Sequence, residues 1–212
     1  MSIIIDSALN FSKALGKVSS DCPAEILHAL ILKEVEYFSF DEKLHRGQLV
    51  INQSAEKDLE EIFELMRKIK FPIAQAIPIS QYQNDDLQSM EANNTSAFNY
   101  RMILNTNQLS QHAYGIALDI NPRENPYLSE GVWYPREAKY NPEIIGTLLA
   151  EDEIVKKFKE LGWIWGGDWE EKDYQHFSKK LGNQKLREKS RCENFRKFRV
   201  SGKRWLKTLW II

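Results

Sequence analysis

Apolar residues recur at helical spacing in three parts of the chain. This spacing predicts helices over residues 24–37, 54–69 and 142–161. The first follows a Ser-Ser-Asp capping signal and Pro23, and the third ends at Gly162. The second has glutamates in its early turns, where they favour the positive end of the helix dipole.

Shorter apolar or aromatic runs predict strands elsewhere. Residues 48–52 are rich in β-branched side chains, residues 71–80 contain two prolines and suit an extended edge strand, and residues 116–120 form another apolar run. Alternating aromatics in residues 163–177 predict two short strands joined by a turn at a glycine pair. Residues 89–99 are dense in Asn, Ser and Thr, which predicts a structured loop. The order, helix-rich and then strand-rich, favours an α+β fold over a βαβ alternation.

Composition excludes several classes of protein. The chain has 212 residues, 42% of them apolar, which is typical of an ordered globular protein. No apolar run approaches the roughly 20 residues that span a bilayer, and the first residues lack the basic and apolar regions of a signal peptide. Two cysteines rule out a disulfide framework or a thiolate zinc cluster, so any metal must be held by His and carboxylates.

The net charge of −1 conceals an asymmetry. Residues 178–212 carry twelve Lys/Arg and two acids, a net charge of +10, so the remaining chain carries −11. Aromatic residues lie among these cations, a mixture suited to an anionic wall polymer, a membrane surface or nucleic acid. Because no nucleic-acid-binding motif is visible, we expect no nucleic acid partner. The alternative is a solvated segment that packs its aromatics on the acidic body.

Two histidines lie near acidic residues. His112 precedes Asp119 by seven positions, and His176 follows Asp173 by three. Catalytic zinc commonly takes three ligands from His and carboxylate side chains, and a turn at Gly115 would place His112 and Asp119 on adjacent extended segments. The trio of His112, Asp119 and His176 is therefore the candidate metal site, with Asp173 as candidate base. Taken singly, each of these residues is more often structural.

The motifs around these residues resemble a known family. Ser-x-His-x-x-Gly-x-Ala-x-Asp occupies residues 110–119, and Trp-Gly-Gly-Asp-Trp and Asp-x-x-His-Phe follow at 165–169 and 173–177. In this order they resemble the zinc peptidase family of D-alanyl-D-alanine carboxypeptidases and L-alanyl-D-glutamate endopeptidases. Residues 89–101 and 47–82 are similar to the endopeptidase branch, which includes phage-type endolysins.

The resemblance implies a fold, a cofactor and residue roles. The fold would be of the Hedgehog/DD-peptidase type, with a small antiparallel sheet that carries the site and packs with helices. The trio would hold Zn²⁺, Asp173 would take a proton from water, and Arg101 would bind the scissile carbonyl or its oxyanion. A surface ion pair is the alternative for Arg101. The chain departs from many relatives at Ser178, where they carry an acid after His-Phe.

Other chemistry-bearing residues have simpler interpretations. We expect His28 and His45 to be structural or solvated, since neither belongs to a motif. Trp165, Trp169 and Tyr174 could line a substrate cleft, although aromatics at such spacing more often belong to a core.

The resemblance extends over residues 34–177, which leaves an N-terminal segment with the first helix at 1–33 and a basic extension at 178–212. The predicted function is hydrolysis of peptidoglycan stem peptides, by carboxypeptidase or endopeptidase action. A noncatalytic zinc-containing module that binds cell wall or a partner is the alternative, and a membrane- or nucleic-acid-binding protein led by the tail is a third. Without a visible signal peptide we expect a cytoplasmic protein, with action at the wall after nonclassical or holin-assisted export. No feature indicates an oligomeric state.

Overall fold

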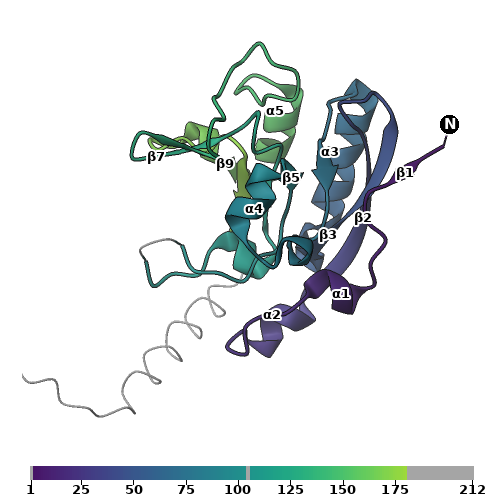
Figure 1. The fold of residues 1–212 in the computed structure, drawn as a ribbon, viewed down its shortest axis with the longest axis vertical. Helices are drawn as coiled ribbons and strands as arrows, with labels where there is room; N and C mark the ends of the chain where they lie inside the picture. The colour runs from purple at the N-terminus through teal and green to yellow at the C-terminus, as the bar shows by residue number, and fades with distance from the viewer. Residues whose placement is uncertain (1, 104–105, 181–212) are drawn as a thin grey trace, which may run out of the picture. The chain divides into compact units, whose positions relative to one another are not determined.

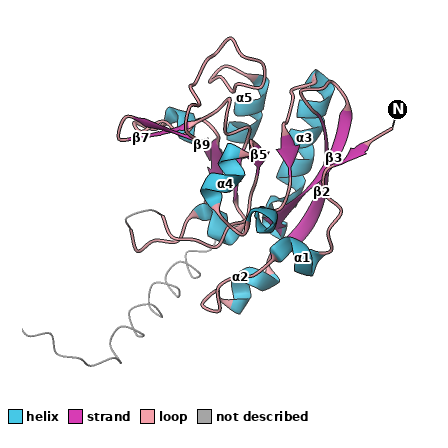
Figure 2. Cartoon of the chain, viewed as in Figure 1, coloured by secondary structure: helices cyan, strands magenta, loops and turns pink. Residues whose placement is uncertain are grey.

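The computed structural model describes residues 2–103 and 106–180, which lie in one compact unit, residues 1–180. Apart from one long hairpin and one long helix, the unit consists of short helices and strands connected by loops (Figures 1 and 2). The predicted α+β class is confirmed. The part of the predicted basic extension beyond Lys180 lies outside the described residues. Within the described residues, no helix combines the length and the apolar character needed to cross a membrane.

The first sheet is built around a long hairpin. Its strand order is β1-β3-β2, with β1 parallel and β2 antiparallel to the central strand. Helix α3 lies along this hairpin (Figure 1) and buries one apolar side against it. The predicted helix at 54–69 is confirmed, apart from a 3₁₀ turn at its start. These elements are β1 (Ile4–Ile5), β2 (Leu30–Phe38), β3 (Leu44–Asn52), η1 (Gln53–Ala55) and α3 (Glu56–Ile69).

The predicted helix over residues 24–37 is wrong beyond its first turn. Only α2 (Ala24–His28) is helical, and β2 begins at Leu30. Val35 and Tyr37 are buried, whereas Glu34 is exposed and the intervening Glu36 is only partly buried. This alternation is the two-residue period of a strand. Pairing along the full length of β3 then outweighs the local helical spacing. Thus the predicted N-terminal segment contributes a strand to the main sheet.

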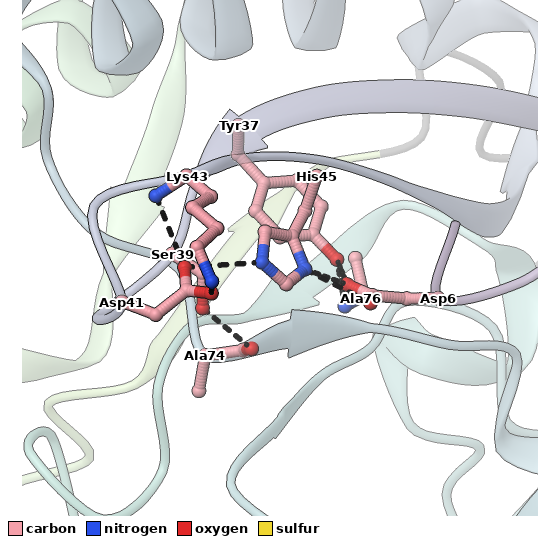
Figure 3. Close-up of polar contacts among 8 residues, drawn as sticks. All are labelled: Asp6, Tyr37, Ser39, Asp41, Lys43, His45, Ala74 and Ala76. Atoms are coloured by element: carbon pink, nitrogen blue, oxygen red, sulfur yellow. Dashed lines mark hydrogen bonds and ion pairs between the residues drawn. The ribbon is translucent and has the colours of Figure 1, made fainter. Parts of the chain in front are cut away.

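A polar cluster anchors the N-terminal strand to this sheet (Figure 3). The buried Tyr37 hydroxyl donates to Asp6 Oδ2 at 2.5 Å and accepts the backbone N–H of Ala76 at 2.9 Å. His45 Nδ1 lies 2.9 Å from Asp6 Oδ1, and its Nε2 lies 3.1 Å from Asp41 Oδ1. His45 therefore joins a structural network that links segments far apart in the sequence.

The second sheet has the order β6-β10-β9, with both pairings antiparallel. Helix α5 packs on this sheet, and the ring of Phe158 stacks on that of Phe177 with the two ring centroids 3.8 Å apart. The predicted strand at 116–120 is confirmed. The predicted helix at 142–161 is too long, because Gly146 has φ +89° and the actual helix begins after its N-cap residue, Asp152. The elements are β6 (Ala117–Asp119), α5 (Glu153–Glu160), β9 (Trp163–Trp165) and β10 (His176–Lys179).

The remaining elements are short and lie in the segments between the strands of the two sheets. The predicted edge strand at 71–80 contains only the two residues of β4, and the predicted loop at 89–99 contains the end of α4 and β5. One apolar core runs from the hairpin and α3 to the second sheet. These elements are α1 (Phe11–Leu15), β4 (Gln75–Ala76), η2 (Ile79–Tyr82), α4 (Asp86–Glu91), β5 (Asn94–Thr95), η3 (Gln111–Tyr114), β7 (Tyr127–Ser129), β8 (Val132–Tyr134) and η4 (Gly166–Asp168).

Candidate metal centre

The register between β6 and β10 brings two of the predicted ligands together. Asp119 and His176 are directly opposed in this antiparallel pair, so their side chains lie on the same face of the sheet. His176 Nδ1 lies 2.9 Å from Asp119 Oδ1. Both residues are buried.

His112 reaches them from a 3₁₀ turn rather than from an extended segment, so the expected adjacent strands are wrong. The hydroxyl of Ser110 caps this turn by accepting the backbone N–H of His112 at 3.3 Å. Gly115 then redirects the chain into β6 with φ +66°. A Cβ at Gly115 would lie 2.7 Å from Asn52 N, so both the conformation and the close approach to β3 require glycine.

The donor set of the trio fits a metal ion. His112 Nδ1 lies 2.5 Å from the Ala97 carbonyl oxygen. Donation to that carbonyl leaves the Nε2 lone pair for the site. Nε2 lies 3.1 Å from Asp119 Oδ2 and 3.2 Å from His176 Nδ1. Ligands about 2 Å from a shared tetrahedral ion lie about 3.3 Å apart, so the spacing of these atoms suits zinc. Among the described residues, this is the one group of three or more potential metal-ligating side chains.

The charges within the trio also favour a cation. Burial opposes ionisation of Asp119, but the neighbouring His112 and His176 outweigh it and hold the carboxyl pKa well below its usual range. Burial likewise disfavours the charged form of His112, yet Asp119 raises the His112 pKa overall. The site therefore presents an ionised carboxylate between two imidazoles in a buried setting, where an unpaired charge is costly and a cation compensates it.

Asp173 lies beside the trio, in the loop between η4 and β10. Its backbone N–H donates to the Gly166 carbonyl at 3.1 Å, and its carbonyl accepts the His176 N–H at 3.2 Å. The residue is half-buried, but its Oδ1 is buried without a hydrogen-bond partner among the described residues. Burial raises the pKa of Asp173 to about 7, although the nearby His176 acts in the opposite direction. A buried acceptor with a pKa near neutrality is suited to proton transfer.

Arg101 has no hydrogen bond or ion pair to the trio among the described contacts. Its Nη2 forms an ion pair with Asp86 Oδ2 at 2.8 Å, which is the pairing that sequence reasoning left as the alternative. Its backbone carbonyl accepts the N–H of Ser110 at 3.0 Å, so Arg101 lies beside the turn that carries His112. Its Nε is buried without a partner in the described part of the chain.

The aromatic residues near the site divide into two groups. Trp165 is buried in the core, whereas Trp169 is 39% exposed, with its ring centroid 5.3 Å from that of His176. Tyr174 belongs with Trp165, because it packs against the core and stacks on Tyr140 with the ring centroids 3.5 Å apart. Trp169 is therefore the one of these three aromatic residues that is both exposed and in ring contact with a residue of the trio.

Sequence reasoning missed two contributors to the site. The Ala97 carbonyl fixes the His112 tautomer, and a backbone acceptor leaves no signature in a side-chain pattern. Asp86 holds Arg101, but in the sequence it follows another aspartate at a helix start, where an acid is explained by helix capping. The sequence signal that could have indicated Asp86 is the second of two adjacent aspartates at the start of the helix that precedes Arg101.

Residues 104–179 match the model of a family described as D-alanyl-D-alanine carboxypeptidase. This segment is about a third of the chain and contains the trio and Asp173, whereas Arg101 precedes it. No curated protein and no solved structure gives a significant match. The resemblance inferred from the motifs is therefore confirmed over this segment, in which residues 104–179 are similar to the D-alanyl-D-alanine carboxypeptidase family of peptidases.

Proposed function

We propose that this protein is a zinc-dependent peptidase that hydrolyses peptide bonds of peptidoglycan stem peptides, on a fold of the Hedgehog/DD-peptidase type. The observation that carries the proposal is the convergence of His112, Asp119 and His176, with ligand atoms within 4.8 Å of one another, beside the unpartnered carboxylate oxygen of Asp173. Both features lie in the segment that matches the peptidase family.

The trio would hold the metal, with His112 binding through Nε2 and His176 through Nδ1. A zinc ion bound there supplies Lewis acidity, which lowers the pKa of a water molecule in the site and polarises a carbonyl oxygen. The Ala97 carbonyl keeps His112 in the binding tautomer, and the strand register keeps Asp119 opposite His176. The protein therefore presents preformed ligands, two from the paired strands β6 and β10 and one from the capped turn η3.

Asp173 would act as the general base and then as the general acid. Its unpartnered Oδ1 is free to accept a proton from the attacking water and to return it to the leaving amine. Arg101 would donate hydrogen bonds to the oxygen of the scissile carbonyl as negative charge develops there, a role that suits a permanently charged guanidinium.

The test measures metal and activity together. We expect wild type to contain one zinc per chain by elemental mass spectrometry and to cleave purified muropeptides. The variant His112→Ala should lose both, because it removes a ligand. Asp173→Asn should retain zinc but lose about 10²-fold or more in kcat, the typical contribution of a general base. The matched control is His28→Ala, since His28 lies at the end of α2, outside the motifs that form the site.

The outcomes separate the alternatives. A wild-type protein without bound zinc would refute the metal site, and full activity in Asp173→Asn would refute the assigned base. A protein that binds zinc but cleaves no muropeptide would instead be the noncatalytic wall-binding or partner-binding module. Release of free D-alanine would identify a carboxypeptidase, and cleavage of an internal bond would identify an endopeptidase.

A further inference from the structure

Asp86 contacts two residues of the segment that leads to the metal centre. It lies in the first turn of α4 and is half-buried. Its Oδ2 is 2.8 Å from Arg101 Nη2, and its Oδ1 accepts a longer hydrogen bond from Asn99 Nδ2 at 3.4 Å. The two oxygens of this carboxylate are thus directed at neighbouring positions of one segment.

This segment is in turn bonded to the turn that carries His112. The backbone N–H of Asn99 donates to the His112 carbonyl at 3.1 Å, and the N–H of Ser110 donates to the Arg101 carbonyl at 3.0 Å. The Arg101 backbone is therefore fixed beside the site. The guanidinium lies at the end of a long flexible side chain, however, and backbone bonds do not determine its direction.

The Arg101 guanidinium and the Asp86 carboxylate form an ion pair, and the backbone of Arg101 is bonded to Ser110 at the start of the turn that carries His112. A guanidinium near a cation-binding site is repelled by the cation it is meant to assist. A carboxylate paired with that guanidinium offsets the repulsion and supplies a fixed hydrogen-bond acceptor.

The remaining donors of Arg101 are available for another acceptor. A guanidinium has five N–H donors, and the contact to Asp86 involves Nη2. Nε is buried without a partner among the described residues, and a buried unpaired donor is uncommon in a folded protein. The side chain is therefore held at one nitrogen while hydrogen-bonding capacity remains unused.

We propose that Asp86 is a positioning residue, which holds the Arg101 guanidinium in the orientation needed to bind the scissile carbonyl. This inference rests on the proposed function, because Arg101 receives its task from that reaction. Asp86 itself touches neither substrate nor metal and acts through Arg101. Its value lies in preorganisation, since a long side chain that is already ordered loses less entropy when substrate binds.

The first test observes Arg101 directly and does not depend on activity. In ¹⁵N-labelled protein, the Nε–Hε resonance of Arg101, assigned by its loss in Arg101→Lys, should show the heteronuclear NOE of an ordered group. In Asp86→Asn it should become motionally averaged. Asp85→Asn is the matched control: Asp85 caps α4, asparagine caps equally well, and the same charge is removed one residue away. An equally ordered Arg101 signal in wild type and Asp86→Asn would overturn the inference.

The second test is a double-mutant cycle on muropeptide cleavage. Asp86→Asn should lower kcat roughly 10- to 100-fold, the range expected for a misplaced catalytic group, with a KM change of less than about threefold and unchanged zinc content. Asp85→Asn should retain wild-type kcat. In an Arg101→Ala background, Asp86→Asn should have no further effect, because the residue through which it acts is gone.

Equal losses in the two backgrounds would mean that Asp86 acts independently of Arg101 and would refute the positioning role. A parallel loss of kcat and thermal stability in both Asp86→Asn and Asp85→Asn would also refute it, in favour of a structural effect on α4. If wild type cleaves no muropeptide, the proposed function fails, while the resonance of Arg101 still decides whether Asp86 orders it.

Discussion

The chemistry of the site depends on which atom each residue offers. His112 would be ambiguous on its own, since either ring nitrogen can carry the proton. The Ala97 carbonyl, 2.5 Å from Nδ1, resolves this by accepting a hydrogen bond from the N–H there, and Nε2 is left to face Asp119 and His176. A single backbone contact therefore determines which nitrogen of the imidazole is available as a ligand.

Burial also controls reactivity at a residue outside the site. Cys22 lies just before α2, and desolvation raises the pKa of its thiol from an ordinary 9.0 to about 11. Because the thiolate is the reactive form and each pKa unit changes its fraction tenfold, alkylation at pH 8 should be roughly a hundredfold slower than in unfolded protein. The rate is measured with iodoacetamide and mass spectrometry of the peptide that contains Cys22.

The pH dependence distinguishes a raised pKa from simple obstruction of access. In the folded protein the alkylation rate should continue to rise up to about pH 11, whereas in guanidinium it should level off about two units lower, near the ordinary thiol pKa of 9.0. Peptide mapping keeps Cys22 separate from Cys192, the second cysteine of the chain. A rate that levels off at the same pH in both states would show that burial leaves the thiol pKa unchanged.

At the residue scale, the sequence predicted the side chains but not their supporting contacts. His112, Asp119, His176 and Asp173 belong to spaced motifs, and the structure brings the first three together as predicted. The contacts of Ala97 and Asp86 depend on tertiary proximity, and neither residue has an unusual side-chain type at its position. Such contacts become visible only when the chain is folded.

At the scale of elements, Gly166 positions the candidate base. A Cβ at this residue would lie 2.4 Å from the Asp173 carbonyl oxygen and 2.9 Å from its Cβ. A backbone atom cannot yield as a flexible side chain can, so Gly166→Ala should displace the loop that carries Asp173. We expect a loss of about 1–3 kcal/mol in unfolding free energy, typical of overpacking, and at least a tenfold lower kcat. Urea denaturation and muropeptide cleavage measure the two effects.

Gly131 offers a matched comparison, because it has φ +79° and a Cβ placed there would meet no atom within 4 Å. Gly131→Ala in the β7–β8 turn should cost about 1 kcal/mol through backbone strain alone, with wild-type kcat. Gly166→Ala with normal kcat would show that the contact with η4 does not position Asp173.

The elements also show where sequence periodicity is insufficient. Leu30, Ile31 and Val35 fit a helical stripe, and together with α2 they predicted one helix, yet Leu30 and Val35 are buried positions of a strand. A short apolar run fits both the helical period of about 3.6 residues and the strand period of two. Here the strand forms because the segment pairs with β3, which follows the next turn of the chain. In contrast, α3 has fourteen residues with a continuous apolar side, and its pattern fits only a helix.

At the scale of the whole molecule, charge is divided along the chain. Residues 181–212 carry ten Lys/Arg and two Glu, a net charge of +8, so residues 1–180 carry −9. The peptidase motifs all lie in the acidic part. A substrate-binding unit of this charge would be repelled by an anionic cell wall, whereas the basic extension would be attracted to it.

We propose that the basic extension binds an anionic polymer of the cell wall and holds the peptidase near its substrate. A chain that ends at Lys180 should fold, since residues 1–180 form a compact unit, and should cleave soluble muropeptides at the wild-type rate. In co-sedimentation with purified cell walls at low salt, it should bind at least tenfold more weakly than the full chain. Added salt should weaken binding of the full chain steeply, because exposed charges are screened within about 10 Å at 0.1 M.

The control for this experiment is a wall preparation stripped of its anionic polymers, on which the two chains should bind alike. Equal binding of both chains to intact walls would refute the proposal and would favour the alternative, in which the cations are neutralised by the acidic part of the same chain. Binding to anionic vesicles, with none to walls, would make a membrane the attachment surface. The salt dependence of binding distinguishes charge contacts from aromatic contacts, because added salt screens charges but does not weaken apolar burial. At about 1 M salt the screening length is only about 3 Å. Binding that persists at this concentration would assign the attachment to the tryptophans and phenylalanines of the extension.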